Sequence, residues 1–526
     1  MLEAGRALTD ADYKEHVPAS SLPYRNRADE VIRRTRPKQK DCYACREWNY
    51  DWFANDIDEP YTTPDDKPFA WMGRMRVVGG RTNVWGRQSY RLGDIDFKAA
   101  SRDGHGVDWP LSYADLAPYY DIVDEYVGIT GINEGADAVV PDGRFHPPMG
   151  MSCIEHAVRR RLRTQFGRTM TLGRSANLTR PINGRSACHY CGPCEQGCAT
   201  HSYFNSAFTT VADALRTGRT TLVTGAMVHQ VIVDPATGKA RGVSYIDRST
   251  RQVREVYARV VVMAAQALES TRILLNSREG GLANGSGVLG KYLMDHISGG
   301  GASAEFPDLA GTVMGPDSPR RPNGIYLMRF RNLPGQPAAK DFLRGYGYQG
   351  GGSTGLRGNA PGFGAAYKAT VRDTATTFNF GGFGECLPYA DNEVSIDRDV
   401  VDTWGIPAAR VHAVARQPTR PAPRHGLAGR RDARRPGRHA HPNPPQRAAS
   451  ARLWYPRSRH GPHGPGREVV GAQSVPAGAR GEEPVCHRRR RLPVDRLPEP
   501  DPDDHGADRA VVRLHTRRNE KGEPVR

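Results

Sequence analysis

Four cysteines lie close together near the middle of the chain, at Cys188, Cys191, Cys194 and Cys198. Their C-x2-C-x2-C-x3-C spacing is that of ferredoxin-like iron–sulfur ligands, although the proline that usually follows the last cysteine is absent. Thiolates at these intervals can converge on one cluster. Zinc binding, and inert or disulfide-bonded cysteines, are alternatives that the spacing leaves open.

A second cysteine pair, Cys42 and Cys45, has the C-x2-C spacing. Such a pair forms a disulfide in an exported complex, or supplies half of a zinc site whose other ligands come from elsewhere. Both interpretations of this pair stay open.

A glycine-rich stretch from Arg76 to Gly86 is the second region whose residues are suited to chemistry. Its β-branched start followed by Gly79 and Gly80 predicts a short strand that runs into a tight turn. Glycines allow the backbone to approach an anionic pyrophosphate, and successive N–H groups can cradle it. A plain turn between a strand and a loop is the alternative.

The segment from Val260 to Ser270 is the third such region. We expect a buried strand at residues 259–264, rich in β-branched residues, that leads into a helix at residues 268–275. A strand that ends in small residues and is followed by a helix is an arrangement that holds a dinucleotide. The small residues Ala264 and Ala265 would permit close packing, and the helix N-terminus carries a positive partial charge.

Together, three pieces resemble the glucose–methanol–choline (GMC) family of FAD-dependent alcohol oxidoreductases, particularly its sugar- and gluconate-dehydrogenase-like flavoprotein subunits. Leu2–Arg6 is similar to the end of the family's second Rossmann strand, where an acidic residue accepts hydrogen bonds from the FAD ribose. The glycine turn is similar to the family's Gly-Gly-Ser-Ser-x-x-Asn stretch, and Val260–Ser270 to the strand and helix under the FAD. The resemblance implies these cofactor-binding residues: Glu3, Gly79, Gly80, Asn83, Val84, Trp85, Val228, Ala264 and Ala265.

Val228 is included because it looks like the family residue whose backbone contacts the adenine, with a plain core position as the alternative. The family's sugar dehydrogenases also carry an iron–sulfur cluster at Cys-x5-Cys-x3-Cys, which maps onto Cys188, Cys194 and Cys198, with Cys191 nearby. The resemblance implies a sugar, polyol or sugar acid as substrate. It further implies a small subunit and a cytochrome electron acceptor as partners.

Two departures from the family pattern concern catalysis. In the family, the Gly-x-Gly-x-x-Gly turn lies about 25 residues before the position of Glu3. This sequence begins at the second strand, so we expect the first βα unit to be missing. We therefore expect phosphate binding to be compromised. The family's catalytic His, in a His-Glu-x-Gly-Thr context, and its later Asn or His are also absent. We therefore assign no catalytic residue and expect the chain as given to be inactive. A non-catalytic iron–sulfur or structural subunit is the alternative function.

The C-terminal segment differs in composition from the rest of the chain. Residues 414–526 contain 25 of the 74 Lys and Arg residues and 12 of the 57 Asp and Glu residues. Most of the net charge of +17 therefore lies in this segment. The segment has no Ile, Phe or Met. Ordering a residue costs about 1–2 kcal/mol in conformational entropy, and this segment has too few large apolar side chains to offset that cost by forming a core. We expect it to be disordered. With one Lys, one Trp and one Tyr, it also lacks the pattern of a nucleic-acid binder.

A shifted reading frame accounts for this tail. With suitable synonymous codons, Pro456–Pro465 becomes His-Glu-Val-Gly-Thr-Ala-Arg-Met-Gly, and Leu497–Ala507 becomes Cys-Gln-Asn-Pro-Thr-Leu-Thr-Ile-Met-Ala. Both missing family motifs appear in this frame. We therefore expect a frameshift near residue 413.

The expected fold class is α/β. A discontinuous Rossmann-like FAD-binding domain spans 1–300, mainly 1–36, 70–130 and 205–300, with a Cys-rich insertion at 187–205; an antiparallel substrate-domain sheet spans 301–413. Expected elements include a helix that Ser112 and Asp115 cap and Gly128 ends, a helix at Ser206–Arg216, and strands at Ile325–Arg329, Thr376–Phe380 and Glu393–Asp397. The longest apolar run, near Val260, is far shorter than the roughly 20 residues of a membrane span. No signal peptide is visible, which leaves localisation open between the cytoplasm and export through a partner's signal.

Overall fold

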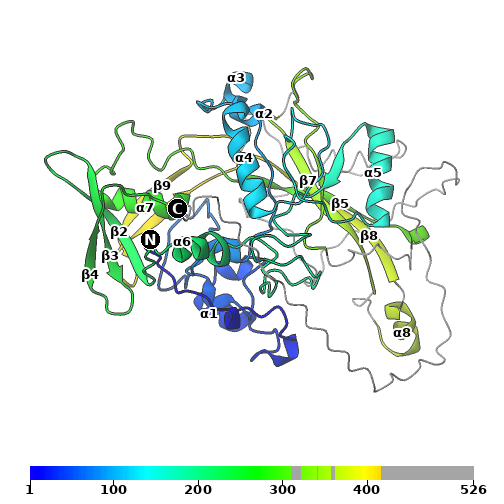
Figure 1. The fold of residues 1–526 in the computed structure, drawn as a ribbon, viewed down its shortest axis with the longest axis horizontal. Coiled ribbons are helices and arrows are strands. Elements are labelled where there is room, and N and C mark those ends of the chain that lie inside the picture. Colours follow the sequence, from blue (N-terminus) through cyan, green and yellow to red (C-terminus); the bar gives the residue numbers. More distant parts are fainter. Residues whose placement is uncertain (310–320, 340–341, 357–361, 373, 416, 418–526) are drawn as a thin grey trace, which may run out of the picture. The chain divides into compact units, whose positions relative to one another are not determined.

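The computed structural model describes residues 1–309, 321–339, 342–356, 362–372, 374–415 and 417 (Figure 1). All of these residues belong to one unit. The predicted disorder and shifted frame of the tail concern residues 414–526, nearly all of which lie outside the described residues.

Within the described residues, the strands form three antiparallel sheets. The largest has the strand order β1-β6-β7-β8-β5, and the other two are β2-β3-β4 and β9-β10. The strands are β1 (Met170–Leu172), β2 (Ala226–Val233), β3 (Ala240–Asp247), β4 (Val253–Tyr257), β5 (His296–Glu305), β6 (Ile325–Leu327), β7 (Tyr346–Leu356), β8 (Thr374–Glu385), β9 (Glu393–Val401) and β10 (Pro407–His412). The strand predicted at 325–329 is confirmed for its first three residues, which form β6, and those predicted at 376–380 and 393–397 are confirmed as parts of β8 and β9.

The helices are mostly short. They are α1 (Asp29–Thr35), α2 (Asp94–Phe97), α3 (Ala99–Asp103), α4 (Tyr113–Val127), α5 (Cys153–Phe166), α6 (Ala212–Arg216), α7 (Ala267–Ser277) and α8 (Gly364–Arg372). The predicted capping of α4 is confirmed, because Asp115 accepts hydrogen bonds from the Ser112 backbone and hydroxyl, and Gly128 ends the helix at φ +80°. The helix predicted at Ser206–Arg216 consists of a π-helical turn followed by α6.

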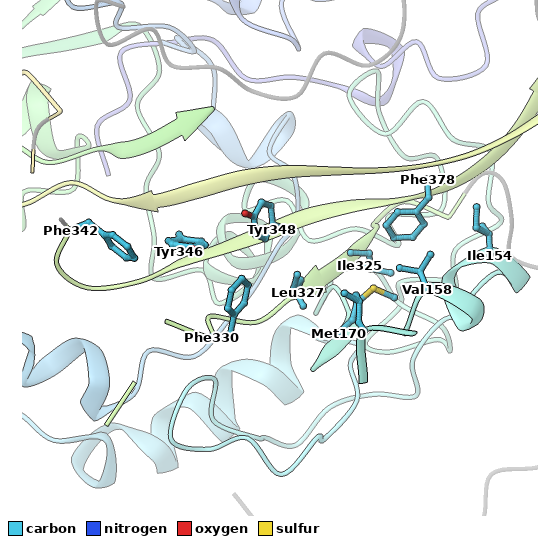
Figure 2. Packing of buried hydrophobic residues seen from close by; sticks show 11 residues of the cluster. Ile154, Val158, Met170, Ile325, Leu327, Phe330, Phe342, Tyr346, Tyr348 and Phe378 are labelled. Carbon is cyan, nitrogen blue, oxygen red and sulfur yellow. The ribbon is translucent and has the colours of Figure 1, made fainter. Parts of the chain in front are cut away.

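Helix α5 packs against the largest sheet and supplies part of the main hydrophobic core (Figure 2). Its buried residues Ile154, Val158 and Leu162 recur every four positions and so share one face. They pack among sheet residues that include Met170, Ile325, Leu327, Tyr348 and Phe378. Each such side chain contributes roughly 1.5–3 kcal/mol when it is buried fully.

The strand predicted at residues 259–264 is wrong. These residues form no strand, and Val260 and Val262 are 73% and 81% exposed. A strand persists only where a neighbouring strand satisfies its N–H and C=O groups, and no described strand pairs with this segment. The helix predicted after it is confirmed as α7.

The mixed α/β class with antiparallel sheets is confirmed, whereas the Rossmann-like layout stays a prediction. Parallel pairing in the described part of the chain occurs as isolated bridges, such as Leu2 with Val223 and Arg6 with Val77. The predicted domain boundaries also stay predictions. None of the helices described here is long and apolar enough to span a bilayer.

Candidate functional site

The N-terminal segment Leu2–Arg6 lies between two segments that are distant in sequence. On one side, the Glu3 N–H donates to Val223 O and Glu3 O accepts from Ala226 N–H, both across 2.9 Å. On the other side, the Val78 N–H donates to Arg6 O across 2.9 Å. This arrangement places Glu3 beside the start of β2 and Arg6 beside the residues that lead into the glycine turn, and we call the three segments 2–6, 77–85 and 223–228 the cofactor cradle.

The Glu3 side chain is held in place by the backbone of Gly5. Its Oε1 accepts a hydrogen bond from the Gly5 N–H across 2.7 Å. Burial raises the pKa of Glu3, and Arg76 and Arg248 oppose that rise. A Cβ at Gly5 would lie 2.0 Å from the Arg76 backbone, so only glycine permits this approach. The structure thus places the predicted ribose-binding carboxylate next to the strand that leads into the glycine turn.

The two glycines of the turn have different surroundings. Gly79 has φ +86°, and a Cβ there would lie 2.9 Å from Ala207 Cβ and 3.0 Å from Asn205 Oδ1. Gly80 has φ +48°, and a Cβ there would meet nothing within 4 Å. Gly79 is therefore packed against neighbouring residues. The space beside Gly80 is open, so an anionic group could approach the backbone there.

Asn83 is buried and its side chain holds the turn together. Its Nδ2 donates to Val78 O (3.1 Å) and Gly80 O (2.8 Å), and its Oδ1 accepts from Tyr13 Oη (2.7 Å) and Asn205 Nδ2 (2.5 Å). A side-chain amide has two donors and two acceptor positions, all of which are used here. A cofactor contact of Asn83 stays a prediction, but the side chain as it stands positions the turn.

Val84 and Trp85 continue the turn into the protein interior. Val84 is buried, and its carbonyl accepts a hydrogen bond from Tyr43 Oη across 2.6 Å. The Trp85 indole donates to Phe204 O across 2.9 Å, and the two rings meet edge to face. Cofactor contacts of both residues stay predictions.

Of the remaining predicted cofactor residues, Val228 lies in the third segment of the cradle, and Ala264 and Ala265 lie outside the cradle. Val228 is half-buried in β2, opposite Tyr245. Ala264 and Ala265 are exposed, and the Ala265 N–H donates to Ser270 Oγ across 3.2 Å. The structure therefore brings segment 2–6, which contains Glu3, beside the segment that leads into the Gly79–Gly80 turn, whereas it leaves the two alanines on a segment without a strand partner.

A buried ion-pair network joins α7 to the segment before the glycine turn. Arg76 contacts Glu59 across 2.6 Å and Glu269, in the first turn of α7, across 2.7 Å. Arg272 of the same helix contacts Asp402 across 2.9 Å. Sequence reasoning missed this network, because its members are far apart in the chain and carry no motif.

The Cys188–Cys198 thiols are all unpaired. Cys194 is buried and the other three are half-buried. The Tyr190 N–H donates to Cys188 Sγ across 3.4 Å, and the Ser202 N–H donates to Cys198 Sγ across 3.2 Å. Backbone N–H groups of this loop therefore donate hydrogen bonds to two of the four sulfurs, those of Cys188 and Cys198.

The four thiols are electrostatic neighbours. Burial raises the pKa of Cys188, Cys191 and Cys194, the last to about 12, and nearby thiols of the same group raise each value further. Nevertheless, among the residues described, no three His, Cys, Asp or Glu side chains are placed to hold a metal ion. The donor chemistry of the group suits iron or zinc, but its thiols would have to move together to ligate either metal.

The Cys-rich segment lies directly against the cofactor cradle. Tyr203 Oη donates to Asn83 O across 2.9 Å, and the Ser206 N–H donates to Thr82 Oγ1 across 3.1 Å. Sequence reasoning missed this proximity, because nothing in either motif refers to the other.

Cys42 and Cys45 are buried and unpaired. Burial raises the pKa of both thiols. The residue between them, Tyr43, is the one that bonds to the Val84 carbonyl. The structure therefore shows two thiols beside the cofactor cradle, while zinc binding by this pair stays a prediction.

Comparisons with known proteins show which sequences this chain is similar to. A family model described as GMC oxidoreductase matches residues 61–298. The chain is 29% identical over 439 residues to a 2-methyl-1,2-propanediol dehydrogenase of Mycolicibacterium austroafricanum, which covers 78% of this chain and 73% of that protein.

Two further relatives match over shorter regions. The fructose dehydrogenase large subunit of Gluconobacter japonicus is 28% identical, over 44% of this chain and 43% of its own length. The paromamine 6'-oxidase of Streptomyces fradiae is 30% identical, over 44% of this chain and 42% of its own length. The matched region thus spans less than half of these two relatives.

Proposed function

Because the chain belongs to the GMC oxidoreductase family, we propose that it serves FAD-dependent oxidation of a hydroxyl group on a sugar, polyol or sugar acid. The observation that carries this proposal is the packing of segment 2–6, which contains Glu3, beside residues 76–78, which lead into the Gly79–Gly80 turn. The substrate class is supported by relatives named for a propanediol and for fructose.

Different residues of the cradle would bind different parts of the dinucleotide. The Glu3 carboxylate would accept hydrogen bonds from a ribose diol, and the open backbone at Gly80 would face the pyrophosphate. Asn83 keeps the turn in the conformation that this contact requires. When bound, FAD supplies the acceptor for the hydride that leaves the alcohol carbon.

A general base must remove the hydroxyl proton, because an alcohol releases hydride readily only as its alkoxide develops. We assign this role to no residue of the printed sequence. The histidines beyond residue 413 lie outside the described residues, and the family's histidine motif appears in the shifted frame. We propose that the chain as printed is inactive for this reason.

We also propose that Cys188, Cys194 and Cys198, with Cys191 nearby, would hold an iron–sulfur centre once their side chains had moved together, and that such a centre would supply an electron acceptor for the flavin. Its support is the C-x2-C-x2-C-x3-C spacing, the backbone N–H donors at Cys188 and Cys198, and the hydrogen bond from Tyr203 of the same segment to the cradle. A cytochrome and a small subunit are the partners that such an electron path requires. Iron and sulfide analysis of anaerobically prepared protein tests this centre directly, with Cys194→Ser as the variant that should lose both.

The activity is tested with two versions of the chain, one as printed and one with its reading frame restored near codon 413. Each is supplied with FAD and an artificial dye, and screened against 1,2-diols, hexoses, hexitols and sugar acids. We expect dye reduction by the repaired chain alone. A repaired chain that binds FAD and oxidises none of these compounds would contradict the proposed activity and favour the non-catalytic subunit.

A further inference from the structure

An exposed turn at Tyr24–Arg27 precedes α1. The Arg27 N–H donates to Tyr24 O across 2.9 Å and closes the turn. The two central residues, Arg25 (φ +52°) and Asn26 (φ +61°), are both in the left-handed region of backbone conformation. Asparagine tolerates this region, whereas other residues with a side chain rarely adopt it. The turn therefore holds Arg25 in a conformation that its own backbone does not favour.

A buried carboxylate keeps the turn in this conformation. Glu47 is buried, and it accepts hydrogen bonds from the Tyr24 N–H at Oε1 (2.5 Å) and from the Arg27 N–H at Oε2 (3.1 Å). Ala28 and Ile32, which follow the turn, are buried in a hydrophobic cluster. Backbone strain persists where the surrounding structure over-determines it, and it clusters at functional sites. The turn is therefore a fixed element whose exposed side chains have a defined position.

The side chains that this region presents to solvent are those of a tyrosine and several arginines. Tyr24 is 46% exposed, and Arg25, Arg27 and, on α1, Arg34 are exposed as well. None of these three guanidinium groups forms an ion pair with any residue that the structure describes, including Asp29 at the start of α1. We call Tyr24, Arg25, Arg27 and Arg34 the basic tip. Its cations are free to bind carboxylates of another molecule.

The loop that fixes the basic tip also contacts both regions described above. Two residues after Glu47, the Asn49 amide donates to Glu195 O of the Cys-rich segment across 3.3 Å. Four residues before Glu47, Tyr43 Oη donates to Val84 O of the cofactor cradle across 2.6 Å. A molecule bound at the basic tip would therefore be connected to both regions through one hydrogen-bonded loop.

The residue types of the basic tip favour a protein as its partner. Arg and Tyr are enriched at protein–protein interfaces and among the residues that contribute most of the binding energy. A guanidinium group forms bidentate hydrogen bonds to a carboxylate, and a fixed turn lowers the entropy cost of docking. Anionic bilayers attract larger clusters of about 4–8 cations. Single-stranded nucleic acids bind in grooves where successive bases stack on aromatic side chains.

We propose that the basic tip is a docking site for a protein that presents Asp and Glu side chains. Arg25, Arg27 and Arg34 bind the carboxylates of this partner, and Tyr24 supplies aromatic contact area. Glu47 is a positioning residue, because it acts on the turn and does not touch the partner. This inference goes beyond the proposed function and does not depend on flavin or metal binding.

The test uses the full chain and a fluorescein-labelled peptide of alternating Glu and Gly residues, with a Gln-for-Glu peptide as its control. Fluorescence anisotropy measures binding to wild type and to a double variant, Arg25→Gln with Arg27→Gln. The matched control, Arg219→Gln with Arg278→Gln, removes two exposed arginines elsewhere in the chain. Binding through the basic residues beyond 413 is common to all these proteins, so only the difference between them is interpreted.

Two further measurements report on the basic tip itself. Hydrogen exchange of the amides of 22–34 is followed with and without the peptide, and with phosphatidylserine vesicles or a single-stranded oligonucleotide in its place. Glu47→Gln replaces one acceptor of the turn by a donor and leaves the arginines unchanged. Thermal unfolding of each variant reports its folding.

We expect the Glu peptide to slow exchange at 22–34, and the double variant to bind it about tenfold more weakly. Glu47→Gln should also weaken binding, whereas the matched control should behave as wild type. If Glu47→Gln fails to fold, the arginine variants alone decide. Raising the salt from about 50 to about 200 mM should weaken binding, because exposed charges are screened.

Three results would overturn the proposal. One is binding of the Glu peptide that the double variant leaves unchanged, and another is exchange at 22–34 that the peptide does not alter. The third is stronger protection of 22–34 by the vesicles or the oligonucleotide than by the peptide, which would assign the basic tip to a lipid surface or to nucleic acid.

Discussion

The side-chain amide of Asn205 donates a hydrogen bond to Asn83 Oδ1 across 2.5 Å, although the two residues are 122 positions apart. Both side chains are fully buried, and Asn205 Oδ1 accepts from the Ala207 N–H across 2.7 Å. The pair therefore fastens the glycine turn of the cofactor cradle to the end of the Cys-rich segment.

Replacing Asn205 with alanine should loosen this turn. The change removes one of the two hydrogen bonds to Asn83 Oδ1, which keeps the one from Tyr13, and leaves the Ala207 N–H without its acceptor. A buried group that is left unsatisfied costs about 1–3 kcal/mol. We expect urea denaturation to show a loss in that range, and hydrogen exchange to become faster for the amides of 79–84. Asn379→Ala, at an exposed position of β8, should change the free energy of unfolding by less than about 0.5 kcal/mol. Equal losses in the two variants would contradict the role of the pair.

The two turn glycines should differ in their tolerance of alanine. Gly79→Ala forces a methyl group against Ala207 Cβ and Asn205 at a left-handed φ, so we expect it to cost roughly 2 kcal/mol or more. Gly80→Ala meets no atom, and only the left-handed φ penalty of about 1 kcal/mol should remain. Thermal denaturation of both variants measures the difference, and a larger loss at Gly80 would show that the turn is described wrongly.

Glu269 should make stability depend on pH in the acid range. Burial raises its pKa, but Arg76, Arg272 and Arg74 outweigh that effect and hold it at about 2, below its ordinary value of 4.5. The stabilising contribution is therefore fully present above pH 4.5 and is lost as the pH falls towards 2. Glu269→Gln should destabilise the protein near neutral pH, by about 3–5 kcal/mol for a broken buried pair, and should flatten the profile between pH 4.5 and 2. Unchanged slopes in denaturation curves over that window would count against the network.

The sequence predicts an element of this structure correctly where the residues that determine the element are close together in the chain. The capping box and glycine end of α4 are contained in the helix itself, so Ser112, Asp115 and Gly128 predict it correctly. The strand at 259–264 could not be judged from its own residues, because a strand exists only with a partner. Asn205 carries no local motif, and its contact with Asn83 becomes visible only once the chain has folded.

The shifted frame yields a prediction that concerns the gene. Its nucleotide sequence across codon 413 should permit the motif His-Glu-Val-Gly-Thr in place of the residues from Pro456. Replacing that histidine with alanine in the repaired chain should lower the turnover rate at least about 100-fold, since general bases contribute about 10²–10⁴-fold, while FAD affinity stays the same. A gene without such a frame would remove the explanation offered for the tail.

The most direct test of the central claim is an equilibrium titration of the chain with FAD, followed by flavin fluorescence. Because only part of the phosphate contact is provided by the Gly79–Gly80 turn, we expect weak, saturable binding that is lost on desalting. Glu3→Ala should weaken it about tenfold or more, as expected for loss of charge-assisted hydrogen bonds worth about 1.5–3 kcal/mol, whereas Asn379→Ala should leave it unchanged. No saturable binding, or binding that Glu3→Ala leaves intact, would contradict a flavin site in the cofactor cradle.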